Sequence, residues 1–403
     1  MVAAMNGPLA PPLPGPERSG QGPGPLSGVL VADFSRVLAG PYATMLLADL
    51  GADVIKVERP GTGDDTRAWG PPFAPDGTAT YFLSVNRNKR SVALDLHAPD
   101  DAALAGELIR RADVVVENFL PGTMDRLGLG AAASRAANPG LVHCSITGFG
   151  DGPGAALPGY DLLAQAVGGL MSVTGEPGSP TKAGVAVVDV ITGLHAAFGI
   201  LAALRHRDST GEGQRISVSL LTSLLSGLVN HTSAHLGAGT VPRAMGNRHP
   251  SIAPYEVFDT ADRPMVIAAG NDRQFHSLCT ALGLAHLAAD ARFATNEARV
   301  AHREALAAEL DARLATATSE IWTAKLTAAG VPCGPINDVA GALGLAEALK
   351  LEAVVEVEGM RQSAHPVRFE RTPAVYWAAP PRLDTDGETV REWLGKGIAG
   401  PGR

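Results

Sequence analysis

The chain has 403 residues, of which 45% are hydrophobic and 18% are charged, and its formal net charge is −8. This length is enough for two domains with buried cores, and the composition excludes a disordered or fibrous chain. The balance of 33 Lys and Arg against 41 Asp and Glu argues against a general nucleic-acid binder. It leaves room for local basic sites that bind an anionic small molecule.

The three cysteines, Cys144, Cys279 and Cys333, are far apart and form no CxxC pair. An odd number without that spacing argues against a disulfide framework or a zinc site and predicts a reducing, cytoplasmic location. We expect no apolar run long enough and sufficiently free of charge to span a bilayer. Residues 1–27 are rich in Pro and Gly and lack the pattern of a signal peptide, which predicts a flexible leader.

From about Gly28 the chain alternates strand and helix patterns. Strands are predicted at 29–34, 53–58, 91–96, 113–119, 141–147 and 213–219, and helices at 41–50, 100–112, 162–170, 194–206 and 223–237. Alternation of this kind is typical of an α/β fold with a doubly wound parallel sheet. We therefore expect a large domain over residues 28–235.

The pattern changes after residue 236. The residues that follow predict a small α+β domain over 236–329, with a hairpin at 255–259 and 264–269 and helices at 272–282, 301–315 and 319–329. Two prolines mark 330–338 as a linker. We expect residues 330–403 to form this linker and a C-terminal segment that returns to the large domain.

One carboxylate needs its own explanation, because Asp189 follows the apolar run 183–188 and precedes the predicted helix at 194–206. A buried charge is costly unless it is paired or hydrogen-bonded. Asp is among the best helix N-caps, so capping is the commoner explanation. The alternative is a carboxylate held at a strand-to-helix turn for covalent chemistry. The local sequence leaves both roles open and favours the cap. Asp161, which also precedes a predicted helix, has the same alternatives.

Basic residues gather at or beyond the predicted strand ends, where parallel sheets bind ligands. A solvated loop charge is the simpler explanation for any one of them. Arg guanidinium groups bind phosphate well, so the set indicates an anionic, phosphorylated ligand. The set comprises Arg36, Arg59, Arg87, Lys89, Arg90 and Arg126.

Several common catalytic motifs are missing from the sequence. The turn after the first predicted strand lacks GxGxxG, and the chain has no GxxxxGK[ST], no GxSxG and no zinc-protease histidine pair framed by an acid. These observations argue against a nicotinamide enzyme, an ATP enzyme, a serine hydrolase and a zinc protease. We expect no metal site.

Seven short motifs resemble, in their order, those of family III CoA-transferases, the family of formyl-CoA and carnitine CoA-transferases. They are DFSRVLAGP at 33–41, GADVIKVE at 51–58, NKRS at 88–91, DVVVENF at 113–119, TGFG at 147–150, TGEGQ at 210–214 and GVPCGP at 330–335. Each motif alone is weak, but the ordered set is specific and the resemblance extends from about residue 28 to 395.

The resemblance implies an enzyme in which Asp189 is the nucleophile. Asp189 would attack an acyl-CoA thioester to give a mixed anhydride, then carry CoA as an aspartyl thioester to an acceptor carboxylate. It implies coenzyme A thioesters as substrates, with no permanently bound cofactor. It also implies a large Rossmann-like domain built from both chain ends, a small domain between them, and an interlocked homodimer. The implied CoA contacts are Val37, Leu38, Arg59, Leu94, Asn118, Phe119 and Arg126.

The segments 159–161, 182–185 and 246–250 are most similar to the branch that uses succinyl-CoA and transfers CoA to dicarboxylates such as glutarate or mesaconate. Leu38 and Pro158 differ from the residues of formyl-specific members, which argues against formyl-CoA and oxalate. The second carboxylate of the acceptor needs a cation. The candidates for substrate binding are Arg36, Tyr160, Asp161, Arg243 and Arg248.

Two other functions are alternatives on the same fold. Racemase relatives carry Gly-His-Asp at 159–161, and racemisation needs two groups that exchange a proton on either side of a carbon. Tyr160 replaces that histidine, which weakens the prediction of a 2-methylacyl-CoA racemase or epimerase. A catalytically silent CoA-binding paralogue is the third alternative, and the presence of Asp189 argues against it.

Overall fold

The computed structural model describes residues 24–398 and divides into two compact units. The larger unit comprises the chain up to Gly168, Ala183–Gly239 and the chain from Glu352. The smaller unit comprises Gly169–Lys182 and Thr240–Leu351. Most of the predicted leader, residues 1–23, lies outside the described residues.

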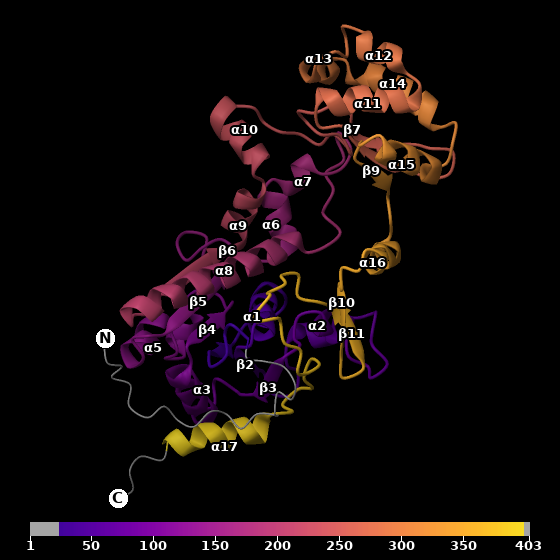
Figure 1. The fold of residues 1–403 in the computed structure, drawn as a ribbon. Helices are drawn as coiled ribbons and strands as arrows, with labels where there is room; N and C mark the ends of the chain where they lie inside the picture. The colour runs from indigo at the N-terminus through magenta and orange to yellow at the C-terminus, as the bar shows by residue number, and fades with distance from the viewer. Residues whose placement is uncertain (1–23, 399–403) are drawn as a thin grey trace, which may run out of the picture. The chain divides into compact units, whose positions relative to one another are not determined.

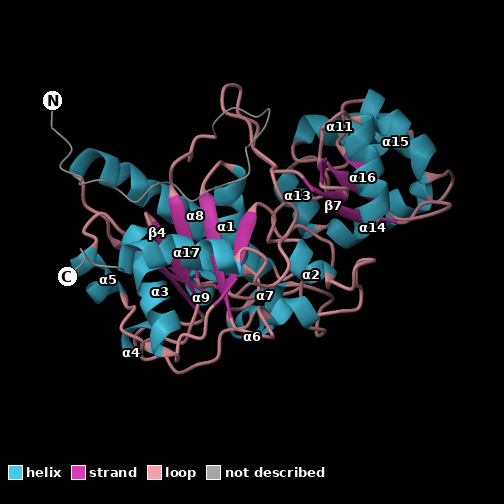
Figure 2. Ribbon diagram, turned by 90° about the horizontal axis from the view of Figure 1, so that it is seen from below, coloured by secondary structure: helices cyan, strands magenta, loops and turns pink. Residues whose placement is uncertain are grey.

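The larger unit is built on a six-stranded parallel sheet with the order β3-β2-β1-β4-β5-β6. Figure 2 draws the strands of the sheet in magenta among the helices. The sheet is the doubly wound one that the alternation of strands and helices predicted. Its strand order reverses between β1 and β4, where ligands bind in open α/β sheets. The strands are β1 (Leu30–Asp33), β2 (Asp53–Glu58), β3 (Lys89–Ala93), β4 (Val114–Glu117), β5 (Val142–Thr147) and β6 (Arg215–Ser219).

Alternate residues of these strands enter two separate cores, because successive side chains point to opposite faces of a sheet. Val31 and Val114 pack with helices α1 (Ala39–Asp49) and α8 (Val187–Thr210). The neighbouring Ala32 and Val115 pack on the other face with α3 (Pro99–Arg111) and α17 (Gly387–Ile398). Both faces are therefore covered at the centre of the sheet, which explains why Leu30–Ala32 of β1 and Val114–Val116 of β4 are apolar without a break.

The remaining helices of the larger unit are short. One predicted helix, 223–237, is in fact two, because Val229 between them has φ +40°. The short elements are α2 (Thr80–Leu83), α4 (Thr123–Arg126), α5 (Ala131–Ala137), α6 (Asp161–Val167), α9 (Leu220–Gly227), α10 (Asn230–Ala238) and the 3₁₀ helix η1 (Asp65–Ala68).

Helix α8 is long and apolar enough to cross a membrane by length and composition alone, contrary to the sequence expectation. Half of the window concerned is buried. The helix packs against α1, β5 and β6, which is the position of a core helix.

The C-terminal segment packs within the larger unit along the edge strand β3 (Figure 1). The backbone N–H groups of Ser91 and Ala93 donate to the carboxylates of Asp386 and Asp384 at 2.9 and 2.8 Å. Helix α17 then packs on α3, and Trp393 enters the core. The segment also holds the hairpin of β10 (Val354–Val357) and β11 (Met360–Ser363).

The smaller unit contains a three-stranded antiparallel sheet of β7 (Tyr255–Phe258), β8 (Met265–Ala268) and β9 (Cys333–Pro335). The predicted linker 330–338 contains β9, and the unit continues to Leu351 instead of ending at residue 329. The sequence concealed β9 because it is three residues long and its motif is rich in Gly and Pro. The helices are α7 (Leu170–Val173), α11 (Asp272–Leu282), α12 (Ala285–Ala289), α13 (Asn296–Ala301), α14 (Arg303–Leu314), α15 (Ser319–Ala328) and α16 (Val339–Ala348).

Candidate functional site

A cavity of about 300 Å³ lies at the carboxyl ends of β1, β4 and β5, next to the point where the strand order reverses. The turn from β1 to α1 forms one wall, and the start of α8 contributes Asp189. The structure brings together here seven residues predicted from the sequence: Arg36, Val37, Leu38, Asn118, Phe119, Tyr160 and Asp189.

Asp189 lies in the first turn of α8 and is not its N-cap. The cap position is Ala186, whose side chain accepts no hydrogen bond, and the residues before it form no strand. Asp161 supplies the missing acceptor, because its Oδ1 accepts from the backbone N–H groups of Val188 and Asp189 at 2.8 and 3.1 Å. The cap predicted for Asp189 is therefore wrong, and Asp161 caps α8 from the first turn of α6.

The Asp189 carboxyl is buried, and no hydrogen bond or ion pair of its side chain occurs among residues 24–398. Burial raises its pKa from 3.8 to about 7, and the negative charge of Asp161 adds to this shift. When a buried carboxyl of this kind ionises, no cation stabilises its negative charge. The ionised Asp189 is therefore set up to react and does not stabilise the fold.

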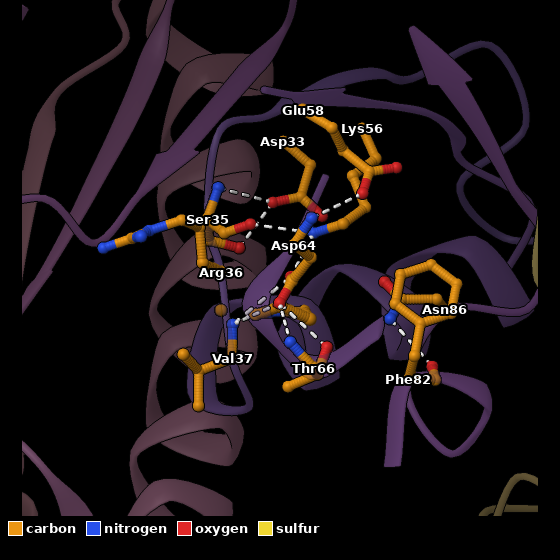
Figure 3. Close-up of polar contacts among 12 residues, drawn as sticks. Asp33, Ser35, Arg36, Val37, Lys56, Glu58, Asp64, Thr66, Phe82 and Asn86 are labelled. Carbon is orange, nitrogen blue, oxygen red and sulfur yellow. Dashed lines mark hydrogen bonds and ion pairs between the residues drawn. The ribbon is translucent and has the colours of Figure 1, made fainter. Parts of the chain in front are cut away.

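The turn from β1 to α1 is held by the side chains of Asn118 and Asp64, which come from other parts of the chain. Figure 3 shows Asp64 beside Val37 of this turn. The Asn118 side-chain amide makes two hydrogen bonds with the backbone of Arg36. Its Oδ1 accepts from the Arg36 N–H at 2.9 Å, and its Nδ2 donates to the Arg36 carbonyl at 2.7 Å. Asp64 accepts from the N–H of Val37, which has φ +69°.

A buried charge network lies behind this turn. Lys56 Nζ is 2.9 Å from Asp64 Oδ2, and Lys89 Nζ is 3.1 Å from Asp33 Oδ2. Burial lowers the pKa of Lys89 to about 8, although Asp33 opposes that shift. Burial would raise the pKa of Asp33, but the two lysines and hydroxyl donors lower it overall.

Three of the basic residues assigned to an anionic ligand have structural roles instead. Arg87 forms a buried ion pair with Asp49 at 2.7 Å, and Lys89 belongs to the network just described. Arg90 is buried with Asp386 at 3.9 Å and Trp377 as neighbours. Sequence position at a strand end did not reveal that these side chains turn inward.

A second cavity of about 200 Å³ adjoins the first, because Arg36 and Phe119 line both. It contains two further predicted contacts, Arg59 and Leu94. At the junction, Asp65 pairs with Arg36 at 2.8 Å and also with Arg59.

The other predicted site residues lie elsewhere. Arg126 is exposed in α4, where its guanidinium donates to Thr123, and it lines neither cavity. Arg243 and Arg248 belong to the smaller unit. There Arg248 forms ion pairs with Glu256 and Glu304, which already balance its charge.

Sequence reasoning missed Asp64, Asp65 and Lys56. The two aspartates fall in a polar segment rich in Gly and Pro that looks like an exposed loop. Lys56 sits within an apolar strand, where an alternating pattern gives no sign of a partner. The only available signal was this lysine itself, since a charge inside a buried strand demands a counterion.

The family model described as CoA-transferase family III matches residues 26–387. A succinate–glutarate CoA-transferase of Agrobacterium fabrum is 45% identical over 379 residues, covering 89% of this chain and 93% of the relative. A succinyl-CoA:glutarate CoA-transferase of Mus musculus is 44% identical, covering 83% and 77%. An acetyl-CoA:oxalate CoA-transferase of Acetobacter aceti is 40% identical, covering 92% and 95%.

The fold also matches solved structures. A CAIB/BAIF family protein from Brucella suis superposes with a TM-score of 0.84 at 43% identity, covering 93% of this chain and all of that one. A protein from M. tuberculosis superposes with a TM-score of 0.82 at 33% identity, covering 91% and 99%.

Proposed function

The chain belongs to CoA-transferase family III, and from this premise we propose that it moves CoA from succinyl-CoA to a dicarboxylate through Asp189. The observation that carries the proposal is the Asp189 carboxyl, which is buried, has no ion-pair partner among residues 24–398, and lies in a cavity that adjoins a second one. Relatives that are named for transfer between succinate and glutarate support the substrate class.

The proposed reaction begins when an Asp189 oxygen attacks the thioester carbonyl. The C–S bond breaks, CoA leaves as a thiolate, and a mixed anhydride forms. The thiolate then attacks the Asp189 carbonyl of the anhydride, which releases the donor carboxylate and leaves an aspartyl-CoA thioester. The acceptor carboxylate attacks this thioester, the C–S bond breaks, and a second mixed anhydride forms as CoA leaves as a thiolate. The thiolate then attacks the acceptor carbonyl of this anhydride, which forms the acceptor acyl-CoA and releases the Asp189 carboxylate. Burial supports these steps because it limits hydrolysis of the anhydride.

Coenzyme A has an elongated shape that could extend over two adjoining cavities. We place its adenine end in the second cavity, near Arg59 and Leu94, and its thioester end beside Asp189. Phe119 lines both cavities and would contact the chain between the two ends. Val37, Leu38 and Asn118 line the thioester end, whereas Arg126 stands apart from both cavities.

Arg36 is the best-placed cation for the distal carboxylate of the acceptor, because it lines the Asp189 cavity. Tyr160 lines the same cavity and is a second substrate contact. Asp161 would act on Asp189 through the backbone instead of binding substrate.

We further propose a homodimer in a reducing cytoplasm. Leu194, Phe198 and Leu201 recur at helical spacing on the exposed side of α8, and Phe198 is 73% exposed. An apolar stripe of this kind is typical of a surface that a partner covers. All three cysteines are free thiols, which is consistent with a reducing compartment.

The direct test incubates the protein with succinyl-CoA and a panel of dicarboxylates and follows the CoA products by mass spectrometry. We expect a new acyl-CoA with glutarate or a similar diacid, and a hydroxylamine-sensitive adduct on Asp189. Deuterium exchange at the α-carbon of a 2-methylacyl-CoA without any acceptor would instead indicate a racemase. Absence of both reactions, with CoA still bound, would indicate a binding paralogue.

A further inference from the structure

The turn from β1 to α1 holds one residue in an unfavourable conformation. Val37 has φ +69°, in the left-handed region that β-branched residues rarely adopt. A strained backbone persists only where its surroundings hold it, and such residues gather at functional sites. Val37 and both its neighbours, Arg36 and Leu38, line the cavity that contains Asp189.

Asp64 is the side chain that holds this conformation. Its carboxylate oxygens lie 3.2 and 3.3 Å from the N–H of Val37 and accept from it. The same carboxylate accepts from the N–H and Oγ1 of Thr66 at 3.0 and 2.8 Å, and pairs with Lys56 at 2.9 Å. Figure 3 shows the carboxylate among these donors.

This carboxylate stays ionised over the range in which an enzyme works. Burial would raise the pKa of Asp64, but the charge of Lys56 and the donors on Lys56 and Thr66 outweigh burial and lower it to about 2. The side chains of Asp64 and Lys56 are both fully buried. Solvent therefore does not screen the hydrogen bonds between the Asp64 carboxylate and the Val37 N–H.

A displacement of the β1–α1 turn would also shift helix α8, which carries Asp189. Helix α1 begins at Ala39, directly after the turn, and the side chain of its N-cap residue Leu38 makes no capping hydrogen bond. Gly193 follows Asp189 by one helical turn, and a Cβ atom there would lie 2.7 Å from the Ala39 carbonyl oxygen. The two helices thus touch at backbone distance, so the position of the turn and that of Asp189 are linked.

We propose that Asp64 is a positioning residue for acyl transfer, which acts by holding Val37 so that the β1–α1 turn faces Asp189 correctly. The inference rests on the proposed role of Asp189. It assigns to Asp64 an effect on the chemical step instead of contact with the substrate.

The test is a double-mutant cycle of Asp64→Asn and Val37→Gly. Asp64→Asn removes the negative charge beside Lys56 and turns one of the two oxygens that accept from the Val37 N–H into a donor, so the hold on the strained turn weakens. We expect kcat to fall about tenfold or more, with KM for the acyl-CoA within about threefold of wild type. Glycine adopts φ +69° without strain. Adding Val37→Gly to Asp64→Asn should therefore restore kcat by about threefold or more, although Val37→Gly alone gives no gain.

Asp49→Asn is the matched control, because it breaks the buried ion pair with Arg87 away from the turn. Its kcat should stay near wild type, and Val37→Gly should not improve it. If Asp64→Asn does not fold, Thr66→Val replaces it, since that change removes only one donor to Asp64. We expect a smaller loss of kcat that Val37→Gly again relieves.

A kcat for Asp64→Asn within twofold of wild type would overturn the inference, as would a loss that Val37→Gly does not relieve. Asp189→Ala, assayed beside these variants, separates the two proposals. If Asp189→Ala abolishes transfer while the cycle shows no coupling, the proposed function stands and the role of Asp64 falls.

Discussion

The start of α8 contains one buried carboxylate, Asp189, and the turn before α1 is held by another, Asp64, but the charged neighbours of the two differ. Asp189 is buried, pairs with no cation in the described part of the chain and lies near the negative charge of Asp161, so its pKa rises to about 7. Asp64 has Lys56 and several donors, so its pKa falls to about 2. One unit of the protein therefore sets one carboxylate to react and another to stay fixed, by the choice of neighbours alone.

The strongest way to test this difference is to remove the reactive carboxylate. Asp189→Ala should reduce CoA transfer by at least about 10³-fold, because no other described carboxylate lines the cavity apart from Asp65, which is engaged by two arginines. Initial rates with succinyl-CoA and glutarate measure the effect, and a retained rate would disprove the nucleophile assignment.

The second test concerns stability. A pKa that rises from 3.8 unfolded to about 7 folded means that the native state holds a proton that the unfolded state has lost. Asp189 therefore costs no stability below pH 3.8, a growing amount up to pH 7, and ~4 kcal/mol above it.

Asp189→Asn, a neutral replacement of similar shape, should accordingly raise the free energy of unfolding at pH 8 and leave it nearly unchanged at pH 4. Urea denaturation at both values measures the difference. Equal gains at both pH values would mean that the stabilisation does not come from the titration of Asp189.

The third test changes the neighbour instead of the nucleophile. Asp161→Asn keeps an oxygen that can accept from the N–H groups of Val188 and Asp189 but removes the negative charge. The pKa of Asp189 should then fall, because Asp161 contributes to raising it. The acidic limb of the kcat/KM profile should move to lower pH, and an unmoved limb would show that burial alone sets this pKa.

The smallest expected effects distinguish the candidate cations for the acceptor. Arg36→Ala should raise the KM for the dicarboxylate by about tenfold, the cost of one charge-assisted hydrogen bond. Arg248→Ala should leave this KM within twofold, because Glu256 and Glu304 already occupy that guanidinium. Arg243→Ala is assayed in parallel. A larger increase in this KM for Arg243→Ala or Arg248→Ala than for Arg36→Ala would indicate that an arginine of the smaller unit binds the acceptor.

The sequence predicted the elements whose signals are local and repeated. The apolar strands and the alternation with helices led to the parallel sheet, whereas β9 was missed because Gly334 and Pro335 are typical of linkers. At the site, Asp189 was found through a motif order and not through its own environment. The burial of Asp64 and the inward course of Arg87 depend on contacts with residues distant in sequence, which no local pattern records.

Residues near the end of the chain cover the edge strand β3, and this affects how the sheet folds during synthesis. The N–H groups of Ser91 and Ala93 find their acceptors only in Asp386 and Asp384, nearly three hundred residues later. During synthesis the nascent sheet therefore presents an open strand edge until the last part of the chain leaves the ribosome. An open edge is a template for pairing with other chains, so this protein should need protection from aggregation late in its translation.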